Sequence, residues 1–323
     1  PDHSFLTNND TLWSPLVLSN VKYSWLLRAI GSPWTPPQYT TIWERNKAQN
    51  NMPAWFSTGN NERGFAYGVQ NLPTEGEVKR LYVASRNGGN FVKVLDATTG
   101  ADVTTGADVA DMNTTGISGG AAVMNDMETS LDGKIFTANL TTNSSTSPFK
   151  VYMWENEAAT PVNIISYTGD AVRLGDKFTV TGSVSDNSAI IWAASATSGF
   201  MKIYKFTMTG GTFSATPTVI SLSDNATGTP TSASVGPLPN GDFYWKATGF
   251  GVKKYSATGT LLGTIPTTLV ASGANAIRYL GTVGTYEYFV VYQYGNGNEN
   301  ARIMKVDPTD FTTATTYELT PTM

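Results

Sequence analysis

Hydrophobic and polar residues alternate over short segments along most of the chain, and Gly, Asn, Asp or Pro separates these segments. Such alternation is typical of β-strands with one buried face. One motif recurs, in which Lys precedes a β-branched residue or a second Lys and then a large apolar residue. Its copies start at Lys93, Lys150, Lys202, Lys253 and Lys305, so that they lie 57, 52, 51 and 52 residues apart. The spacing predicts an internal repeat of about 52 residues.

The one longer interval has a local cause. Residues 98–103, Thr-Thr-Gly-Ala-Asp-Val, are repeated at once as residues 104–109, and removing this duplication shortens the interval from 57 to 51 residues. One period upstream of Lys93, the segment Thr41-Ile42-Trp43-Glu44 keeps the apolar pair but not the Lys. Counting this segment gives six copies, which account for nearly all of the 323 residues.

Each copy contains several segments with strand character. In the copy around Lys150 they are Gly120–Met124, Lys134–Ala138, Phe149–Trp154 and Val162–Tyr167. Four short strands per repeat of this length are typical of a propeller blade, and packing blades in a ring buries their faces. A parallel β-helix has shorter repeats. We therefore expect an all-β protein, a β-propeller of six blades over residues 41–323 with four antiparallel strands per blade. Seven blades is the alternative if the first forty residues fold differently.

Residues 1–40 differ from the rest because they are rich in tryptophan. Five of the eight Trp residues lie in the first 55 positions, and Pro33, Pro36 and Pro37 argue against a central strand there. Two interpretations stay open. The segment is an irregular first blade, or it is a docking arm that contacts a neighbouring subunit or surface, since aromatic anchors dominate interface energies. In the second interpretation the interface residues are Trp13, Trp25 and Trp34.

The composition narrows the class of partner and the compartment. Charged residues make up 14% of the chain and the net charge is −4, so a nucleic-acid partner is not expected. There is no Cys, which excludes disulfides and thiolate metal sites. No apolar run reaches the roughly 18 residues of a membrane span. The low charge, the Thr- and Asn-rich strands and the start at Pro1 favour a secreted or cell-surface protein.

Few residues offer catalytic or metal chemistry. His3 is the only histidine, and it stands at the terminus, which disfavours a Ser-His-Asp triad. Asp126 and Glu128 would face the same way in a strand, as paired carboxylates of a glycosidase do, but they precede a predicted turn where solvated acids are ordinary. The metal content stays unknown. Asp102, Asp108 and Asp111 are candidates for a structural calcium site, although their spacing does not match an EF-hand. No other cofactor is expected.

The ring geometry suggests where a ligand would bind. Inner strands and the loops at one mouth of a propeller channel converge on the axis. Polar residues capable of holding a carboxylate or a sugar are grouped at the start of a predicted inner strand and in blade loops. The candidate binding residues are Asn61, Glu62, Arg63, Arg86, Asn87 and Asn125. The alternative is that they form turns and pairs between blades.

Several stretches also resemble a known family. They include Pro53-Ala54-Trp55-Phe56, residues 59–68, Ser85-Arg86-Asn87-Gly88-Gly89, residues 117–120, residues 138–141, residues 147–152 and residues 174–178. Over about residues 40–320 the sequence resembles a family of uncharacterised bacterial secreted and cell-surface proteins, a domain of unknown function with a predicted propeller architecture. The resemblance implies export and a propeller fold. It implies no activity, because the family carries no assigned catalytic residues.

These observations favour a non-catalytic extracellular propeller that binds a glycan or a protein partner, including copies of itself. The repeat, the missing nucleophile and base, and the aromatic N-terminus all point this way. Two alternatives stay open because a propeller hosts many functions. One is a carbohydrate-active enzyme that uses carboxylates near the propeller channel. The other is a structural subunit of a surface layer or filament.

Overall fold

A computed structural model describes most of the chain, and its described part is built from β-strands without helices. The described residues are 42–45, 49–57, 61–72, 76–103, 111–225, 230–270, 273, 276–293 and 300–318, with the two short strands β1 (Val17–Leu18) and β2 (Val21–Lys22). Trp13, Trp25 and Trp34, proposed above as interface residues, lie outside the described residues.

Strands β1 and β2 pair with each other, and the other strands form five sheets, one after another along the chain. Blade 1 contains β3 (Glu62–Leu72), β4 (Gly76–Ser85), β5 (Phe91–Asp96) and β6 (Asp111–Met112). Blade 2 contains β7 (Ala122–Thr129), β8 (Ile135–Leu140), β9 (Phe149–Trp154) and β10 (Val162–Tyr167). Blade 3 contains β11 (Phe178–Thr181), β12 (Ile190–Ala194), β13 (Lys202–Thr209) and β15 (Thr218–Ser221), while β14 (Thr212–Phe213) pairs with the end of β13.

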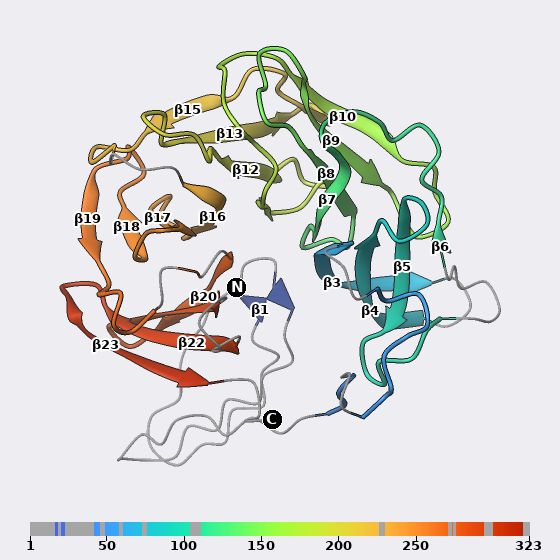
Figure 1. Ribbon diagram of the computed structural model, residues 1–323, viewed down its shortest axis with the longest axis horizontal. Coiled ribbons are helices and arrows are strands. Elements are labelled where there is room, and N and C mark those ends of the chain that lie inside the picture. The colour runs from blue at the N-terminus through green and yellow to red at the C-terminus, as the bar shows by residue number, and fades with distance from the viewer. Residues whose placement is uncertain are drawn as a thin grey trace.

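Blades 4 and 5 repeat the same order of strands. Blade 4 contains β16 (Thr231–Pro237), β17 (Phe243–Thr248), β18 (Lys253–Tyr255) and β19 (Leu261–Thr264). Blade 5 contains β20 (Ala276–Val283), β21 (Tyr286–Gln293), β22 (Asn300–Asp307) and β23 (Asp310–Glu318). All the strand pairs within the blades are antiparallel, and Figure 1 shows the five sheets following one another around an axis, with β3, β7, β16 and β20 innermost.

The third strand of each blade carries the repeated Lys motif. In blade 3, Lys202 Nζ and the hydroxyl of Tyr204 each lie 2.7 Å from Asp170 Oδ2, and Asp170 follows the last strand of blade 2. In blade 4, Lys253 and Tyr255 bind Asp224, which follows the last strand of blade 3, in the same way. We call these two groups the inter-blade Lys–Asp–Tyr clusters. In blades 3 and 4 the side chains of the motif therefore join consecutive blades.

Hydrophobic side chains fill the space between consecutive blades. Clusters of buried residues lie between blades 1 and 2, 2 and 3, 3 and 4, and 4 and 5. Burying one large apolar side chain contributes about 1.5–3 kcal/mol, so these clusters supply most of the stability of the ring. Ring pairs across blade boundaries include Phe149 with Phe206, Trp192 with Phe243 and Tyr244 with Phe289.

The expected number of six blades is not supported, nor is the alternative of seven, because the described residues form five. Ile42 and Trp43, taken above as the first copy of the repeat, belong to no strand. Instead the Trp43 side chain packs, with that of Trp55, against the buried Leu81 and Leu95 of blade 1, and its indole N–H donates to the carbonyl of Ala97 at 2.9 Å. Trp43 thus covers a face of the first blade, whereas Ile42 is 75% exposed, and neither residue starts another blade.

Candidate functional site

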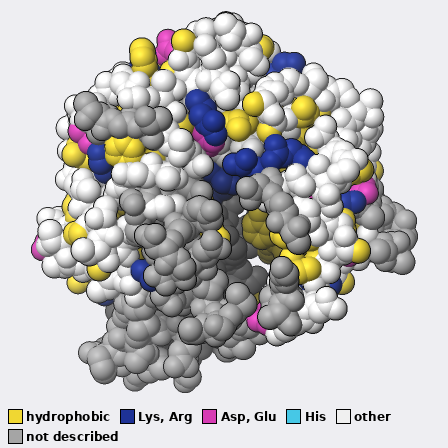
Figure 2. Space-filling model, in the orientation of Figure 1, with side chains coloured by type: hydrophobic (Ala, Val, Ile, Leu, Met, Phe, Trp, Pro, Cys, Tyr) yellow, Lys and Arg dark blue, Asp and Glu magenta, His cyan; other side chains and the backbone are white. Residues whose placement is uncertain are grey.

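A cavity of about 930 Å³ opens on the propeller axis, where the first strands of all five blades converge. Its volume suits an oligosaccharide-sized or cofactor-sized molecule. In Figure 2 basic side chains gather beside the central hollow, with hydrophobic side chains at its edge. The lining residues that carry polar or aromatic groups are Phe56, Glu62, Arg63, Phe65, Asp126, Glu128, Asp176, Lys177, Phe178, Thr179, Thr231, Ser232, Ser234, Thr248, Arg278 and Tyr292.

A β-bulge at the start of β3 directs two consecutive charged residues to the cavity. The register of β3 against β4 shifts between Glu62 and Gly64, and such a bulge re-aims the side chains beside it. Gly64 also lets β3 lie against β7, because a Cβ at this position would stand 2.6 Å from the Cα of Asp126. Glu62 and Arg63 of blade 1 are thereby brought next to Asp126 of blade 2.

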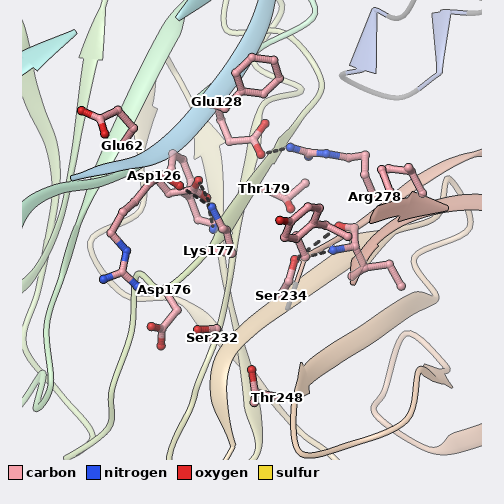
Figure 3. Close-up of a pocket in the computed structure, with 18 of the residues that line it drawn as sticks. Glu62, Asp126, Glu128, Asp176, Lys177, Thr179, Ser232, Ser234, Thr248 and Arg278 are labelled. Atoms are coloured by element: carbon pink, nitrogen blue, oxygen red, sulfur yellow. Dashed lines mark hydrogen bonds and ion pairs between the residues drawn. The ribbon is translucent and has the colours of Figure 1, made fainter. Parts of the chain in front are cut away.

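Asp126 forms a buried ion pair between blades 2 and 3. Its carboxylate lies 2.8 Å from Lys177 Nζ and accepts the backbone N–H of Phe178 at 3.1 Å (Figure 3). The same ammonium also donates to the carbonyl oxygen of Arg63 at 2.8 Å. Burial raises the pKa of Asp126, and Lys177 and the Phe178 amide oppose that effect. Lys177 therefore connects three blades at the cavity wall.

The other acidic groups of the cavity are also engaged. Glu128 of β7 is buried and forms an ion pair with Arg278 of β20, which Figure 3 shows pointing toward it. Asp176 accepts a hydrogen bond of 2.7 Å from Arg173 Nε. Because the Glu128–Arg278 pair joins β7 to β20, it spans the axis of the propeller and does not join neighbouring blades.

Glu62 is held by hydroxyl groups. Its Oε1 accepts the Ser85 hydroxyl at 2.8 Å and its Oε2 accepts the Ser57 hydroxyl at 2.9 Å. Ser85 is the residue that pairs with Glu62 across the β3–β4 ladder, while Ser57 belongs to the segment that precedes blade 1. These hydrogen bonds orient the carboxylate without supplying a countercharge.

Hydroxyl groups and aromatic rings complete the lining. Thr179 stands on β11, Ser232 and Ser234 on β16 and Thr248 on β17, all labelled in Figure 3. Ser232 has a φ of 52°, a left-handed conformation at the register shift between Thr231 and Ser234. The rings of Phe56, Phe65 and Tyr292 are 41%, 52% and 41% exposed. Exposed rings next to hydroxyl and charged groups are well suited to a ligand with both apolar and polar faces.

Of the binding residues proposed from the sequence, some line the cavity and others do not. Glu62 and Arg63 line it, but Asn61, Arg86, Asn87 and Asn125 are not among the lining residues. Their contacts are mostly structural, with Asn87 donating to the Trp55 carbonyl at 3.0 Å and the buried Asn125 to that of Gly175 at 2.8 Å. The backbone N–H of Arg86 donates to the Asn61 carbonyl at 3.1 Å.

The interpretation of Asp126 and Glu128 as solvated turn residues is wrong. Both are buried on β7, at 3% and 5% exposure, and both face the cavity. Sequence reasoning also did not propose Lys177 and Arg278 as site residues. The one local signal was that Asp126 and Glu128 stand two apart on a strand, which does direct them to the same face.

The described residues show neither a cluster of metal-ligating side chains nor a membrane-spanning helix. Within the described ranges no group of three or more His, Asp or Glu side chains is placed to hold a metal ion, and structural calcium stays a prediction. In that part of the chain, too, no helix is long and apolar enough to cross a membrane.

The fold and the axial cavity define a five-bladed β-propeller with a ligand-sized central site. The model of the DUF4623 family, described as a domain of unknown function, matches residues 75–302, and the chain belongs to this family. The resemblance seen in the sequence to a domain of unknown function with a propeller fold is thus confirmed. No curated protein sequence matches the chain.

Solved structures share the fold at low identity. A DUF4623 family protein from Bacteroides eggerthii DSM 20697 has a TM-score of 0.56 at 18% identity, over 77% of this chain and 55% of that one. The chain therefore spans little more than half the length of that relative. The α-L-arabinanase of Penicillium chrysogenum has a TM-score of 0.47 at 10% identity, over 75% of this chain and 77% of that one. The GH93 α-L-arabinofuranosidase of Fusarium graminearum gives 0.46 at 11%, over 83% of each chain. These likenesses concern the fold alone.

Proposed function

We propose that the protein binds a carbohydrate in its axial cavity and does not cleave it. The observation that carries this proposal is the state of the four carboxylates. Asp126, Glu128 and Asp176 each have a cationic partner, and Glu62 is held by two hydroxyls. A glycosidase needs one carboxyl group to donate a proton and another to attack the sugar or activate water. Carboxylates committed to ion pairs are poorly prepared for both roles.

The rest of the lining supports a sugar ligand. A sugar ring presents C–H groups on its faces and hydroxyls around its edge. The exposed rings of Phe56, Phe65 and Tyr292 offer surfaces for those faces, and Ser232 and Thr248 offer hydrogen bonds to the edge. Such a combination of a few polar groups with aromatic surface is typical of small-molecule sites.

The test is a binding measurement with an aromatic variant. Wild-type protein is titrated calorimetrically with a panel of plant, bacterial and host oligosaccharides. Phe65→Ala is expected to weaken the binding of any ligand found by about tenfold, because stacking on a ring contributes about 1 kcal/mol or more. Phe200→Ala is the matched control, since Phe200 is 48% exposed but does not line the cavity. Equal affinity of the wild type and Phe65→Ala would place the sugar elsewhere.

A carbohydrate-active enzyme is the second candidate, and Asp126 is the observation in its favour. Burial raises the pKa of this carboxyl group, and a raised pKa is what a general acid needs near neutral pH. The same oligosaccharide panel is therefore also assayed for release of reducing ends. Turnover by the wild type that is lost in Asp126→Asn would replace the binding proposal by the enzymatic one.

The compartment and the assembly of the protein are further parts of the proposal. We propose that the propeller acts outside the cell or on its surface, where it meets glycans or protein partners, including other copies of itself. The low charge and the Thr- and Asn-rich strands support this location. A surface-layer or filament subunit is tested by size-exclusion chromatography of the full chain at high concentration, where elution as a monomer contradicts it.

A further inference from the structure

Ion pairing among the described residues of the cavity wall leaves one lining cation, Arg63, without a carboxylate partner. Of the three lining cations, Lys177 pairs with Asp126 and Arg278 pairs with Glu128. Among the described residues, the exposed guanidinium of Arg63 has neither a hydrogen bond nor an ion pair, and only its backbone carbonyl is used, by Lys177. An Arg side chain beside several carboxylates ordinarily forms an ion pair with one of them. The unpaired guanidinium of Arg63 therefore points to a role in ligand binding.

The neighbourhood of Arg63 has an excess of positive charge. Burial and repulsion from Arg63 lower the pKa of Arg86, and Glu62 opposes this effect. The ammonium group of Lys177 also lies near Arg63, where it donates to the backbone carbonyl, although Lys177 forms its ion pair with Asp126. Glu62, the nearest acid, is turned to the hydroxyls of Ser57 and Ser85. An anion placed at Arg63 would offset the repulsion between the two guanidinium groups.

Phe65 lies beside this cation. Arg63 and Phe65 are two residues apart on β3, so both side chains leave the same face of the strand, and both line the cavity. Two positions along a strand correspond to roughly 7 Å at about 3.3 Å per residue. A sugar ring stacked on Phe65 could therefore place a carboxylate substituent at Arg63.

We infer that the ligand is an acidic glycan, and that Arg63 binds the carboxylate of a uronic acid or a similar acidic sugar. This inference rests on the proposed carbohydrate-binding function and specifies its ligand class. A guanidinium holds a carboxylate through two parallel N–H···O bonds, which fixes the orientation of the sugar as well as its charge. Phe65 supports the ring of the same residue. The charges of Asp126 and Glu128 are balanced by Lys177 and Arg278, and Glu62, which has no countercharge, is turned to the hydroxyls of Ser57 and Ser85.

The experiment compares each acidic oligosaccharide with its own neutral derivative. Galacturonate and glucuronate oligosaccharides are titrated into the full chain before and after chemical reduction of every carboxylate to a primary alcohol. The acidic forms are expected to bind about 10- to 100-fold more tightly, the range that corresponds to a hydrogen bond to a charged group. Arg63→Gln is expected to remove that preference, so that the acidic and reduced forms bind this variant with equal affinity.

The control is Lys79→Gln, which removes an equal charge from β4 at the far end of the β3–β4 ladder, where Lys79 pairs with Val69. It is expected to keep the preference for carboxylates. If acidic and reduced forms bind equally, the acidic-glycan inference is wrong while carbohydrate binding stands. A preference that survives in Arg63→Gln overturns the role of Arg63. If no oligosaccharide binds at millimolar concentration, the proposed function fails together with the inference.

Discussion

The charged groups at the periphery of the propeller and those at its axis follow different rules. At the periphery, the same Lys–Asp–Tyr cluster occurs at two consecutive boundaries, where Asp170 joins blade 2 to blade 3 and Asp224 joins blade 3 to blade 4. At the axis, the pairs Asp126–Lys177 and Glu128–Arg278 have no counterpart of the same residues in other blades of the described part of the chain. Repetition at consecutive boundaries indicates a role in stability. A unique arrangement at the point where all blades meet indicates a role in ligand binding.

Among the charged groups that join blades, we expect the largest effect on stability from replacing a buried acid between blades 4 and 5. Glu287 of β21 accepts the hydroxyl of Tyr244 and the ammonium of Lys254, each at 2.6 Å, and both partners belong to blade 4. Glu287→Gln leaves Lys254 buried without its countercharge. We expect a loss of about 3–5 kcal/mol in the free energy of unfolding, measured by chemical denaturation.

The control for Glu287→Gln is Glu77→Gln, which makes the same change at an exposed position of β4. We expect it to change the free energy of unfolding by less than about 0.5 kcal/mol. A similar effect of the two variants would mean that Glu287 contributes no more than a surface charge. In that case the blade boundaries are held by the hydrophobic clusters alone.

The repeated cluster at Asp170 has a smaller expected effect. Asp170→Asn removes the charge that Lys202 and Tyr204 bind at 2.7 Å. The Asp170 carboxylate is 38% exposed, so solvent screens the interaction, and we expect a loss of about 1 kcal/mol in the free energy of unfolding. Ligand affinity is expected to stay unchanged, since this cluster lies outside the cavity lining. If Asp170→Asn altered the ligand affinity and left the free energy of unfolding unchanged, the peripheral cluster would have a role in binding and not in stability.

The pH dependence of the free energy of unfolding provides a control for Asp170→Asn. Hydrogen bonds from Lys202 and Tyr204 hold the pKa of Asp170 below its ordinary value. The advantage of the wild type over Asp170→Asn is therefore complete above the ordinary pKa, at about pH 4, and is lost as the pH falls toward the lowered one. Asp126 has the opposite sign, because burial raises its pKa and acidification relieves the cost of a buried charge. Two unfolding curves that stay parallel below pH 4 would contradict the lowered pKa of Asp170.

The periodic part of this architecture was predictable from the sequence, and the rest was not. The Lys motif marks the third strand of all five blades, because strand spacing repeats with the blade. Extrapolation to Ile42 and Trp43 failed because an apolar residue such as Trp43 can cover a sheet face without belonging to a strand. Asp126 was misinterpreted because its partner Lys177 is 51 residues away, across a blade boundary that local sequence does not show. Arg63 was found because its position at a strand start near the axis follows from the repeat.

The boundary between blades 1 and 2 offers the smallest test, because its cluster lacks the acid. Tyr152 donates from its hydroxyl to the carbonyl of Ser118 at 3.2 Å, and Lys150 Nζ stands 3.4 Å from the Ser118 hydroxyl, an exposed group. Ser118 thus occupies the place that Asp170 and Asp224 have at the next two boundaries.

Ser118→Asp is expected to complete the cluster and raise the free energy of unfolding by about 0.5 kcal/mol at low salt. Added salt should abolish the gain, since it screens a surface pair. The double variant Ser118→Asp, Lys150→Gln is expected to show no gain, and a gain that persists in it would mean that the new acid acts without Lys150.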